Sequence, residues 1–255
     1  MQRRRHIERE FGVPIAGEIL APSQWTQTAL KRLPPGRIDW RTLFGRDAPR
    51  ILDLGCGNGR FLIHSAVWRP EFDHIGVDIL PVVIRYATRR GNQRGLRNLR
   101  FAVCGAHEFL DRHIEPGTIQ EIHCYHPQPY DDPLRAARRL ITPTFLSLVH
   151  RSLVPGGSFF IQTDHPGYWE YMRRVVPAFF DFHEQPGPWP DAPKGRTRRE
   201  IIALKRGLPV FRGWGTARSD LSDGEVTRLA ATLPLPTFSA DRRLRWLDEL
   251  ERRGH

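Results

Sequence analysis

The chain has 255 residues, of which 40% are hydrophobic and 10% aromatic, and this is typical of one sizeable globular domain. No apolar run approaches the roughly 20 residues of a membrane span, and the basic start "MQRRRHIERE" is not followed by the apolar segment of a secretory signal, so we expect neither a membrane protein nor an exported one. The 39 Lys and Arg against 28 Asp and Glu give a net charge of +11, which indicates a polyanionic partner.

The predicted elements begin with a basic N-terminal arm and a lead-in rich in Pro and Gly, residues 1–35. Short β-like runs then alternate with helical stretches. The predicted strands are residues 50–54, 74–78, 99–103, 118–125 and 157–164. The predicted helices lie near residues 58–67, 81–94, 105–113, 142–153 and 166–176. This alternation predicts parallel βαβ units, and therefore an α/β fold with a doubly wound sheet that binds ligands at the carboxyl ends of its strands.

The pattern changes beyond Pro177. We interpret "AFFDFHEQ" and "TRREIIALKRGLPVFRG" as two further strands, antiparallel and at one edge of the sheet, joined by a proline-rich loop at residues 186–195. The stretch "SADRRLRWLDELERRG" has leucines at helical spacing and predicts one surface helix. We therefore divide the chain into the arm and lead-in (1–35), a main domain (36–213) and a helical C-terminal extension (214–255).

The three cysteines, Cys56, Cys104 and Cys124, each lie in or beside an apolar segment, and an odd number does not suit a disulfide framework. We predict buried, reduced thiols and a cytoplasmic protein. His123 and His126 flank Cys124, but alternation along a strand points His123 and Cys124 to opposite faces, and no second ligand pair lies nearby. We expect no metal.

Two stretches are rich in basic residues and poor in acids. Six arginines between residues 85 and 100 have no acidic neighbour, and seven Lys or Arg between residues 194 and 212 accompany the single acid Glu200. Such clusters predict a surface that faces phosphate, because Arg binds phosphate oxygens through two parallel hydrogen bonds. A merely solvated face is the alternative.

The sequence "DLGCGNG" lies where the first strand of the main domain meets its first helix. Gly55, Gly57 and Gly59 permit a sharp turn and let the backbone approach a ligand closely. A dinucleotide-binding fingerprint would have its third glycine at position 60, which is Arg60, and this argues against NAD. The acid two residues before the first glycine, Asp53, is instead similar to that of class I S-adenosylmethionine methyltransferases, where it lies near the ammonium group of the ligand.

Residues 36–213 resemble the bacterial tRNA guanine-N7 methyltransferases. The resemblance rests on "IDWRTLFGRDAPRILDLGCGNGRFL", on "PGGSFFIQTDHPGYWEYM" and above all on "TRRE" followed by "GLPVFR", which a general methyltransferase does not need. It implies a Rossmann-like class I methyltransferase sheet, mostly parallel with an antiparallel edge. It also implies S-adenosyl-L-methionine as cofactor and the variable-loop guanosine at tRNA position 46 as the target. The cofactor-binding residues that it implies are Asp53, Gly55, Gly57, Gly59, Asp78, Gly105 and Gln128. Of these, Asp78 would accept the ribose hydroxyls, and its alternative role is a helix cap.

The chain departs from the family pattern at several positions. The family's loop after the fourth strand usually reads Phe-Pro-Asp-Pro-Trp, whereas this chain has "HPQPY", with Gln128 in place of the acid and Tyr130 in place of the tryptophan. Asp132 stands where a lysine is usual, and Gly105 stands where an acid commonly contacts the adenine end of the cofactor. These exchanges remove charge from the predicted site.

Loss of the acid at Gln128 is not expected to abolish the reaction. The N7 atom of guanine carries an in-plane lone pair, so no general base is required. The reaction does require alignment of the reacting atoms, which supplies roughly 7–11 kcal/mol in well-oriented cases. Gln128 still offers a carbonyl oxygen but loses a charged hydrogen bond of about 1–3 kcal/mol. We therefore expect a weakened or retuned enzyme.

The resemblance also implies a set of substrate-side residues. Asp164 would accept hydrogen bonds from guanine N1 and N2, so Gln128 and Asp164 form the predicted catalytic pair, and the alternative for Asp164 is a helix cap before Pro166. Thr197 and Glu200 would complete the guanosine pocket, and the alternative is a pair of exposed strand residues. The predicted substrate-binding residues are Asp132, Arg138, Arg139, Asp164, Thr197 and Glu200. The two arginines would contact phosphate, and the alternative is a solvated helix face.

Two other functions suit parts of the sequence. The loop "HPQPY" also resembles the Pro-Pro-Tyr loops of methyltransferases that act on amines. The exchanges at Gly105, Gln128 and Asp132 suit a protein that binds tRNA without turnover. We expect tRNA as the partner, no membrane and no metal, and a monomer, with a dimer as the alternative.

Overall fold

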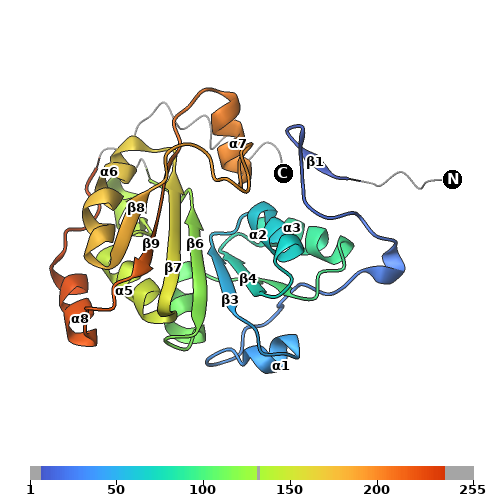
Figure 1. Cartoon of the computed structure of the whole chain (residues 1–255), viewed down its shortest axis with the longest axis horizontal. Helices are drawn as coiled ribbons and strands as arrows, with labels where there is room; N and C mark the ends of the chain where they lie inside the picture. Colours follow the sequence, from blue (N-terminus) through green and yellow to red (C-terminus); the bar gives the residue numbers. More distant parts are fainter. Residues whose placement is uncertain (1–6, 131–132, 239–255) are drawn as a thin grey trace.

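The computed structural model describes residues 7–130 and 133–238. A seven-stranded sheet of order β5-β4-β3-β6-β7-β9-β8 forms its centre (Figure 1). The strands are β3 (Arg50–Leu54), β4 (Asp73–Asp78), β5 (Leu99–Val103), β6 (Ile119–Tyr125), β7 (Leu153–Thr163), β8 (Phe180–Glu184) and β9 (Phe211–Ala217). Strands β3 to β7 are parallel, whereas β9 runs antiparallel to both β7 and β8. The predicted doubly wound sheet with an antiparallel edge is confirmed.

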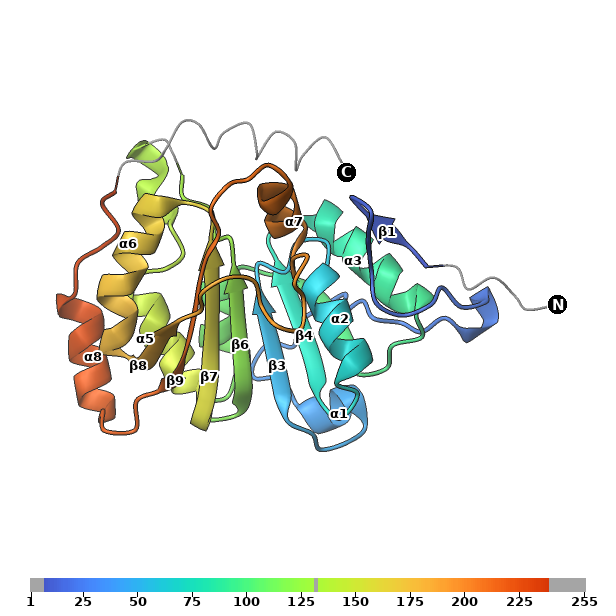
Figure 2. The same cartoon turned by 45° about the horizontal axis from the view of Figure 1, so that its top comes forward.

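Helices cover both faces of this sheet (Figure 2). The helices are α1 (Trp40–Phe44), α2 (Arg60–Trp68), α3 (Pro81–Gln93), α4 (Ala106–Glu108), α5 (Pro143–Ser152), α6 (Pro166–Val175), α7 (Arg198–Lys205) and α8 (Asp223–Thr232). Short turns of helix lie at η1 (Pro22–Gln24), η2 (Phe109–His113), η3 (Pro133–Arg138) and η4 (Val176–Ala178). Phe61 and Leu62 of α2 belong to the core on one face, and Phe145 of α5, Tyr168 of α6 and Val226 of α8 belong to the core on the other. Parallel strands covered in this way are buried on both faces, which explains their continuous apolar runs.

Several predicted helices begin at a proline. Pro81, Pro143 and Pro166 occupy the first turns of α3, α5 and α6, where the missing backbone N–H has no partner to lose. The Thr142 hydroxyl caps α5 by accepting from the Phe145 N–H, and the His165 ring caps α6. Asp164 is therefore not the cap of α6, which was its alternative role.

The segment from Thr197 to Lys205 corrects one prediction, because it forms helix α7 and not a strand. The Thr197 hydroxyl accepts from the Glu200 N–H and begins the helix, which is followed by Gly207 in the left-handed region with φ 65°. A threonine followed three residues later by glutamate is a sequence signature of a helix start. The apolar residues after Thr197 are compatible with a helix or a strand, and the cap at Thr197 favours the helix.

The N-terminal arm folds back onto the main domain. It forms the hairpin of β1 (Arg9–Glu10) and β2 (Val13–Pro14), and farther on Thr28 and Leu30 exchange backbone hydrogen bonds with Phe101 of β5. The lead-in thus covers the exposed edge of the sheet, which would otherwise be open to pairing with another chain. The predicted domain boundaries at residues 35 and 213 stay predictions.

Other features of the described ranges bear on the sequence predictions. Cys56, Cys104 and Cys124 are free and buried, as predicted. No helix within residues 7–130 or 133–238 has the length and apolar character to cross a membrane. Helix α8 was not predicted, and a capping box between Ser222 and Glu225 begins it. The surface helix predicted from residue 239 lies outside the described residues.

Candidate active site

The glycine-rich turn after β3 opens a crevice at the carboxyl ends of the strands. Gly55 and Gly57 have positive φ angles of 81° and 52°, and a Cβ atom added to either would meet nothing within 4 Å. Gly59 differs, because its Cβ would lie 2.7 Å from the ring of Phe101 and 2.8 Å from Ala87. The first two glycines therefore leave room for a ligand, and Gly59 permits close packing of α2 against the sheet.

Asp78, at the end of β4, is held next to this turn by the backbone. One carboxylate oxygen accepts from the Gly57 N–H at 3.1 Å and the other from the Leu80 N–H at 2.9 Å. Burial raises the pKa of the Asp78 carboxyl. Because two amides fix the carboxylate at the rim of the crevice, its oxygens are placed to accept further hydrogen bonds from hydroxyl groups.

Asp53, one residue before the end of β3, is the least satisfied carboxylate of the crevice. Its side chain is only 3% exposed, and it has no hydrogen bond or ion pair with any residue of the described ranges. Burial and the neighbouring Asp78 carboxylate raise the pKa of Asp53 to about 8. A buried carboxyl without a counter-ion is costly, and a cationic amine in the crevice would relieve that cost.

These residues fit the predicted S-adenosylmethionine. Asp53 would hold the ammonium group, Asp78 the ribose hydroxyls, and the open turn at Gly55 and Gly57 the amino-acid end. Gly105, between β5 and α4, adds no side chain, and the nearest atom to an added Cβ would be the Ile79 side chain at 3.9 Å. The adenine end would therefore meet backbone and apolar groups in place of an acid.

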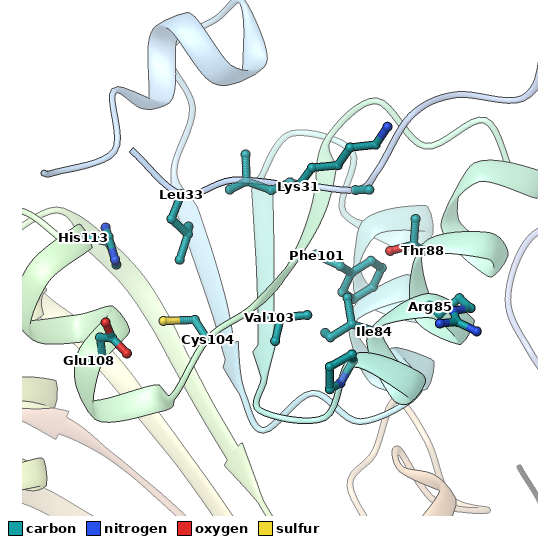
Figure 3. Close-up of a pocket in the computed structure, with 13 residues that line it drawn as sticks. Lys31, Leu33, Ile84, Arg85, Thr88, Phe101, Val103, Cys104, Glu108 and His113 are labelled. Carbon is teal, nitrogen blue, oxygen red and sulfur yellow. The ribbon is translucent and has the colours of Figure 1, made fainter. Parts of the chain in front are cut away.

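A separate cavity of about 660 Å³ lies beside β5, between the lead-in and the start of α3 (Figure 3). Val103, Cys104 and Ile84 line it, and Lys31 and Arg85 lie among its polar residues. None of the predicted cofactor residues lines it, although Cys104 directly precedes Gly105. The cavity thus adjoins the predicted adenine end of the crevice and is not the crevice itself.

The loop after β6 is bent by two residues in the left-handed region, His126 with φ 51° and Tyr130 with φ 46°. Gln128 lies between them with an exposed side chain. Arg139 lies beneath the loop, 5% exposed, and donates to the carbonyls of Pro129 at 2.6 Å and Tyr130 at 3.2 Å. The Arg139 guanidinium thus holds the loop that carries Gln128, and its predicted phosphate contact stays a prediction.

The other residues of this basic stretch have different environments. Arg138 is exposed, which leaves its predicted phosphate contact open as a prediction. Asp132 lies outside the described residues.

Asp164, just after β7, is buried and has two charged or polar partners. Its Oδ2 accepts from the Arg199 Nε at 2.7 Å, and its Oδ1 lies 3.2 Å from the His126 Nδ1. Burial alone would raise the pKa of the Asp164 carboxyl, but its hydrogen bond with His126 and the charge of Arg199 outweigh burial and hold that pKa below its ordinary value. Asp164 is thus an ionised acceptor at the carboxyl end of the sheet.

Glu200 of α7 is fully buried. One carboxylate oxygen accepts from two nitrogens of Arg212 at 2.8 and 2.6 Å, and the other accepts from the Arg196 N–H at 2.7 Å and the Gln162 side chain at 3.2 Å. The structure therefore ties Glu200 to β9 and β7. Its predicted contact with guanine, like that of Thr197, which caps α7, stays a prediction.

The arginine-rich stretches are not, for the most part, free surfaces, which corrects the predicted phosphate-facing clusters. Glu8 of the arm pairs with Arg90 at 2.9 Å and Arg94 at 3.0 Å, and Glu10 pairs with Arg198 at 3.0 Å. Arg199 and Arg212 are buried on Asp164 and Glu200. Sequence distance hid most of these partners, because Glu8 and Glu10 lie in the arm and Asp164 lies just after β7. The exposed basic side chains that remain are Arg85, Arg89, Arg97, Lys194, Lys205 and Arg206.

Sequence reasoning missed four residues that hold the site together: His126, Gln162, Trp189 and Arg199. One signal was available in the sequence. The motif "TRRE" contains Arg199, and an acid, Asp164, follows the predicted fifth strand; these two side chains are partners in the structure. Nothing in the linear pattern placed Trp189 of the proline-rich loop, whose indole donates to the Gln162 side chain at 2.7 Å.

Comparisons with known proteins agree with this geometry. A family model described as a putative methyltransferase matches residues 47–211. The tRNA (guanine-N(7)-)-methyltransferase of Halorhodospira halophila is 32% identical over 82% of this chain and 92% of its own length. The corresponding enzyme of Alkalilimnicola ehrlichii is 33% identical over 82% and 90%. Among solved structures, the 16S rRNA methyltransferase KamB has a TM-score of 0.56 at 16% identity, covering 75% of this chain and 99% of that chain, a likeness in fold alone.

Proposed function

The chain belongs to the tRNA (guanine-N(7)-)-methyltransferase family, and from this premise we propose that it transfers a methyl group from S-adenosylmethionine to guanine N7 in tRNA. The relatives that bear this name match the chain over 92% and 90% of their own length. They give no support to an amine-directed methyltransferase or to a tRNA-binding protein without activity.

The observation that carries the proposal is the pair of opposite environments at the carboxyl edge of the sheet. On β3, Asp53 is a buried carboxyl without a counter-ion in the described part of the chain, which suits the cationic donor. Just after β7, Asp164 is an ionised carboxylate fixed by Arg199, which suits the N1 and N2 donors of guanine. Parallel strands bring these two carboxyls to the same edge.

The reaction requires the protein mainly to position the donor and the base. S-adenosylmethionine, when bound, supplies an electrophilic methyl group. Guanine N7 has a free lone pair, so the residues need only hold the base in line and keep water out. We propose that Asp164 orients the guanine edge and that Gln128, exposed on the bent loop, contacts the base or the cofactor through its amide. Thr197 and Glu200 would support the guanosine pocket from α7.

The tRNA backbone would meet the exposed cations. Arg85 and Arg89 lie exposed on α3, Arg138 in η3, Lys194 before α7 and Lys205 at the last residue of α7. With a net charge of +11 on the chain, these side chains supply the phosphate contacts that nucleic-acid binding needs. We propose position 46 of the variable loop as the target. A tRNA substrate and three free thiols support a cytoplasmic location.

Methylation of unmodified tRNA by labelled donor tests the proposal. The wild-type protein should place label on one guanosine, and borohydride and aniline cleavage should map it as N7-methylguanosine at position 46. A transcript with adenosine at that position and the Asp53→Ala variant are the controls, and both should take up no label. Label on an exocyclic amine, or none with a protein shown to be folded, would reject the proposed function.

A further inference from the structure

His126 begins the bent loop, and its side chain turns back under that loop toward β7. Its backbone N–H donates to the Gln162 carbonyl at 2.8 Å, and its side chain is 7% exposed. The two ring nitrogens have separate partners: Nδ1 lies 3.2 Å from Asp164 Oδ1, and Nε2 lies 3.0 Å from Gln162 Nε2. Each ring nitrogen thus faces a group on the β7 side of the site.

The partners of Gln162 decide which ring nitrogen carries the proton. The Trp189 indole N–H only donates, and it lies 2.7 Å from Gln162 Oε1, which fixes the orientation of the amide. The Gln162 NH₂ group therefore points to His126 Nε2 and to Glu200 Oε2 at 3.2 Å. Because an NH₂ group can only donate, His126 Nε2 must accept. The ring proton is then on Nδ1, where it donates to Asp164.

This arrangement explains one departure of the chain from its family pattern. Where the family usually has phenylalanine, the residue His126 offers an N–H to the acid on the next strand. The same loop lacks the family's acid at Gln128. The loop has thus lost a carboxylate of its own and gained a hydrogen bond to the carboxylate of Asp164.

We propose that His126 is a positioning residue, held as the neutral Nδ1–H tautomer, which fixes the loop carrying Gln128 to the substrate-side carboxylate Asp164. One oxygen of Asp164 is then held by His126 and the other by Arg199, so the carboxylate presents its remaining lone pairs in one direction. The lone pair of His126 Nε2 is used by Gln162, so the imidazole does not serve as a general base. This suits a target such as N7 that needs no deprotonation, and the inference rests in this respect on the proposed function.

The tautomer is tested first, because this measurement does not depend on activity. Nitrogen-15 spectra of the labelled full-length protein at about pH 8 should show one neutral imidazole with a protonated Nδ1. Its signals are assigned as those missing from His126→Asn among the 11 histidines. An imidazole protonated at Nε2, or a cation, at that position would overturn the inference even if the enzyme methylates tRNA as proposed.

Three variants then separate the two hydrogen bonds. In His126→Asn, the new side-chain amide nitrogen takes the place of the imidazole Nδ1 and still donates to Asp164, so this variant should keep kcat within about threefold of wild type. His126→Gln reaches only the Gln162 side, and His126→Phe reaches neither. Both should lose kcat at least about tenfold, with KM for the donor changed less than about twofold, because alignment is lost and the crevice is intact.

The comparison of the variants decides the role. Equal loss in His126→Asn and His126→Phe, or full activity in His126→Phe, would overturn the positioning role. Urea unfolding of each variant shows that the compared proteins are folded. An inactive wild type would reject the proposed function and not the tautomer, which the spectra settle by themselves.

Discussion

Replacing Glu200 by alanine should strongly destabilise the protein, although this residue belongs to the motif predicted to bind substrate. The Glu200 side chain is 0% exposed and that of Arg212 is 3% exposed. Glu200→Ala leaves the Arg212 guanidinium buried without its carboxylate, and it removes the acceptor of the Arg196 N–H and the Gln162 side chain. The substitution therefore lowers the free energy of unfolding by destabilising the folded state.

The size of the loss follows from burial. Removing one partner of a buried ion pair costs about 3–5 kcal/mol. The whole free energy of unfolding of a domain is only about 5–15 kcal/mol, so this single change removes a large part of it. Glu200→Gln keeps an acceptor oxygen and loses the charge, and it should cost about 1.5–3 kcal/mol.

Urea unfolding, followed by the fluorescence of the seven tryptophans, measures these differences. The matched control removes both charges. Glu200→Met with Arg212→Met should cost less than the sum of the two single changes, because it leaves no buried charge alone. An unchanged urea midpoint in Glu200→Ala would refute the reasoning and would show that the carboxylate faces solvent.

Three further predictions concern the crevice. Gln128→Asp should raise the single-turnover rate constant about tenfold, because it restores a charged hydrogen bond, and Gln128→Asn should not. Equal rate constants for the two variants would count against a role for charge in the loop. Gly105→Asp should lower the Kd of the donor about tenfold in calorimetry, because it adds a charged hydrogen-bond acceptor. The backbone tolerates this change, since φ −71° and ψ 139° suit any residue and the nearest atom to an added Cβ lies at 3.9 Å. Weaker binding would contradict the prediction. The raised pKa of Asp53, about 8, means that the folded protein binds more protons than the unfolded chain from about pH 4 to 8, so stability without ligand should fall as pH rises through that range. Asp53→Asn should flatten this dependence of the urea midpoint on pH, and an unchanged slope would assign it to other groups.

The sequence predicts the parallel strands well, because strands buried on both faces leave uninterrupted apolar runs between glycine and proline. It predicts the glycine-rich turn equally well, since Gly55 and Gly57 must adopt positive φ angles that other residues avoid. The segment that begins at Thr197 forms a helix and not the predicted strand, although the sequence contains its capping signature. Local patterns of this kind are decided by a few residues in contact along the chain.

The partners of charged side chains were not predictable in the same way. Arg139 and Arg198 look like any exposed arginine in the sequence, and only the fold shows that one holds loop carbonyls and the other meets Glu10. The order of the strands brings such groups together from distant parts of the chain. An ion pair between residues far apart leaves no periodic trace, so net charge indicates the class of partner and not the residues that touch it.

The contact of Glu10 with Arg198 also has a consequence for how the protein is made. These residues are separated by 188 positions, and the same carboxylate accepts from Asn58 of the glycine-rich turn at 2.8 Å. The arm leaves the ribosome before α7 but reaches its final place only when α7 has emerged. Contacts of such long range slow folding, so the crevice acquires this support only after residue 198 has been made. A nascent chain stalled before residue 198 should therefore expose the arm to proteases that leave the finished protein intact.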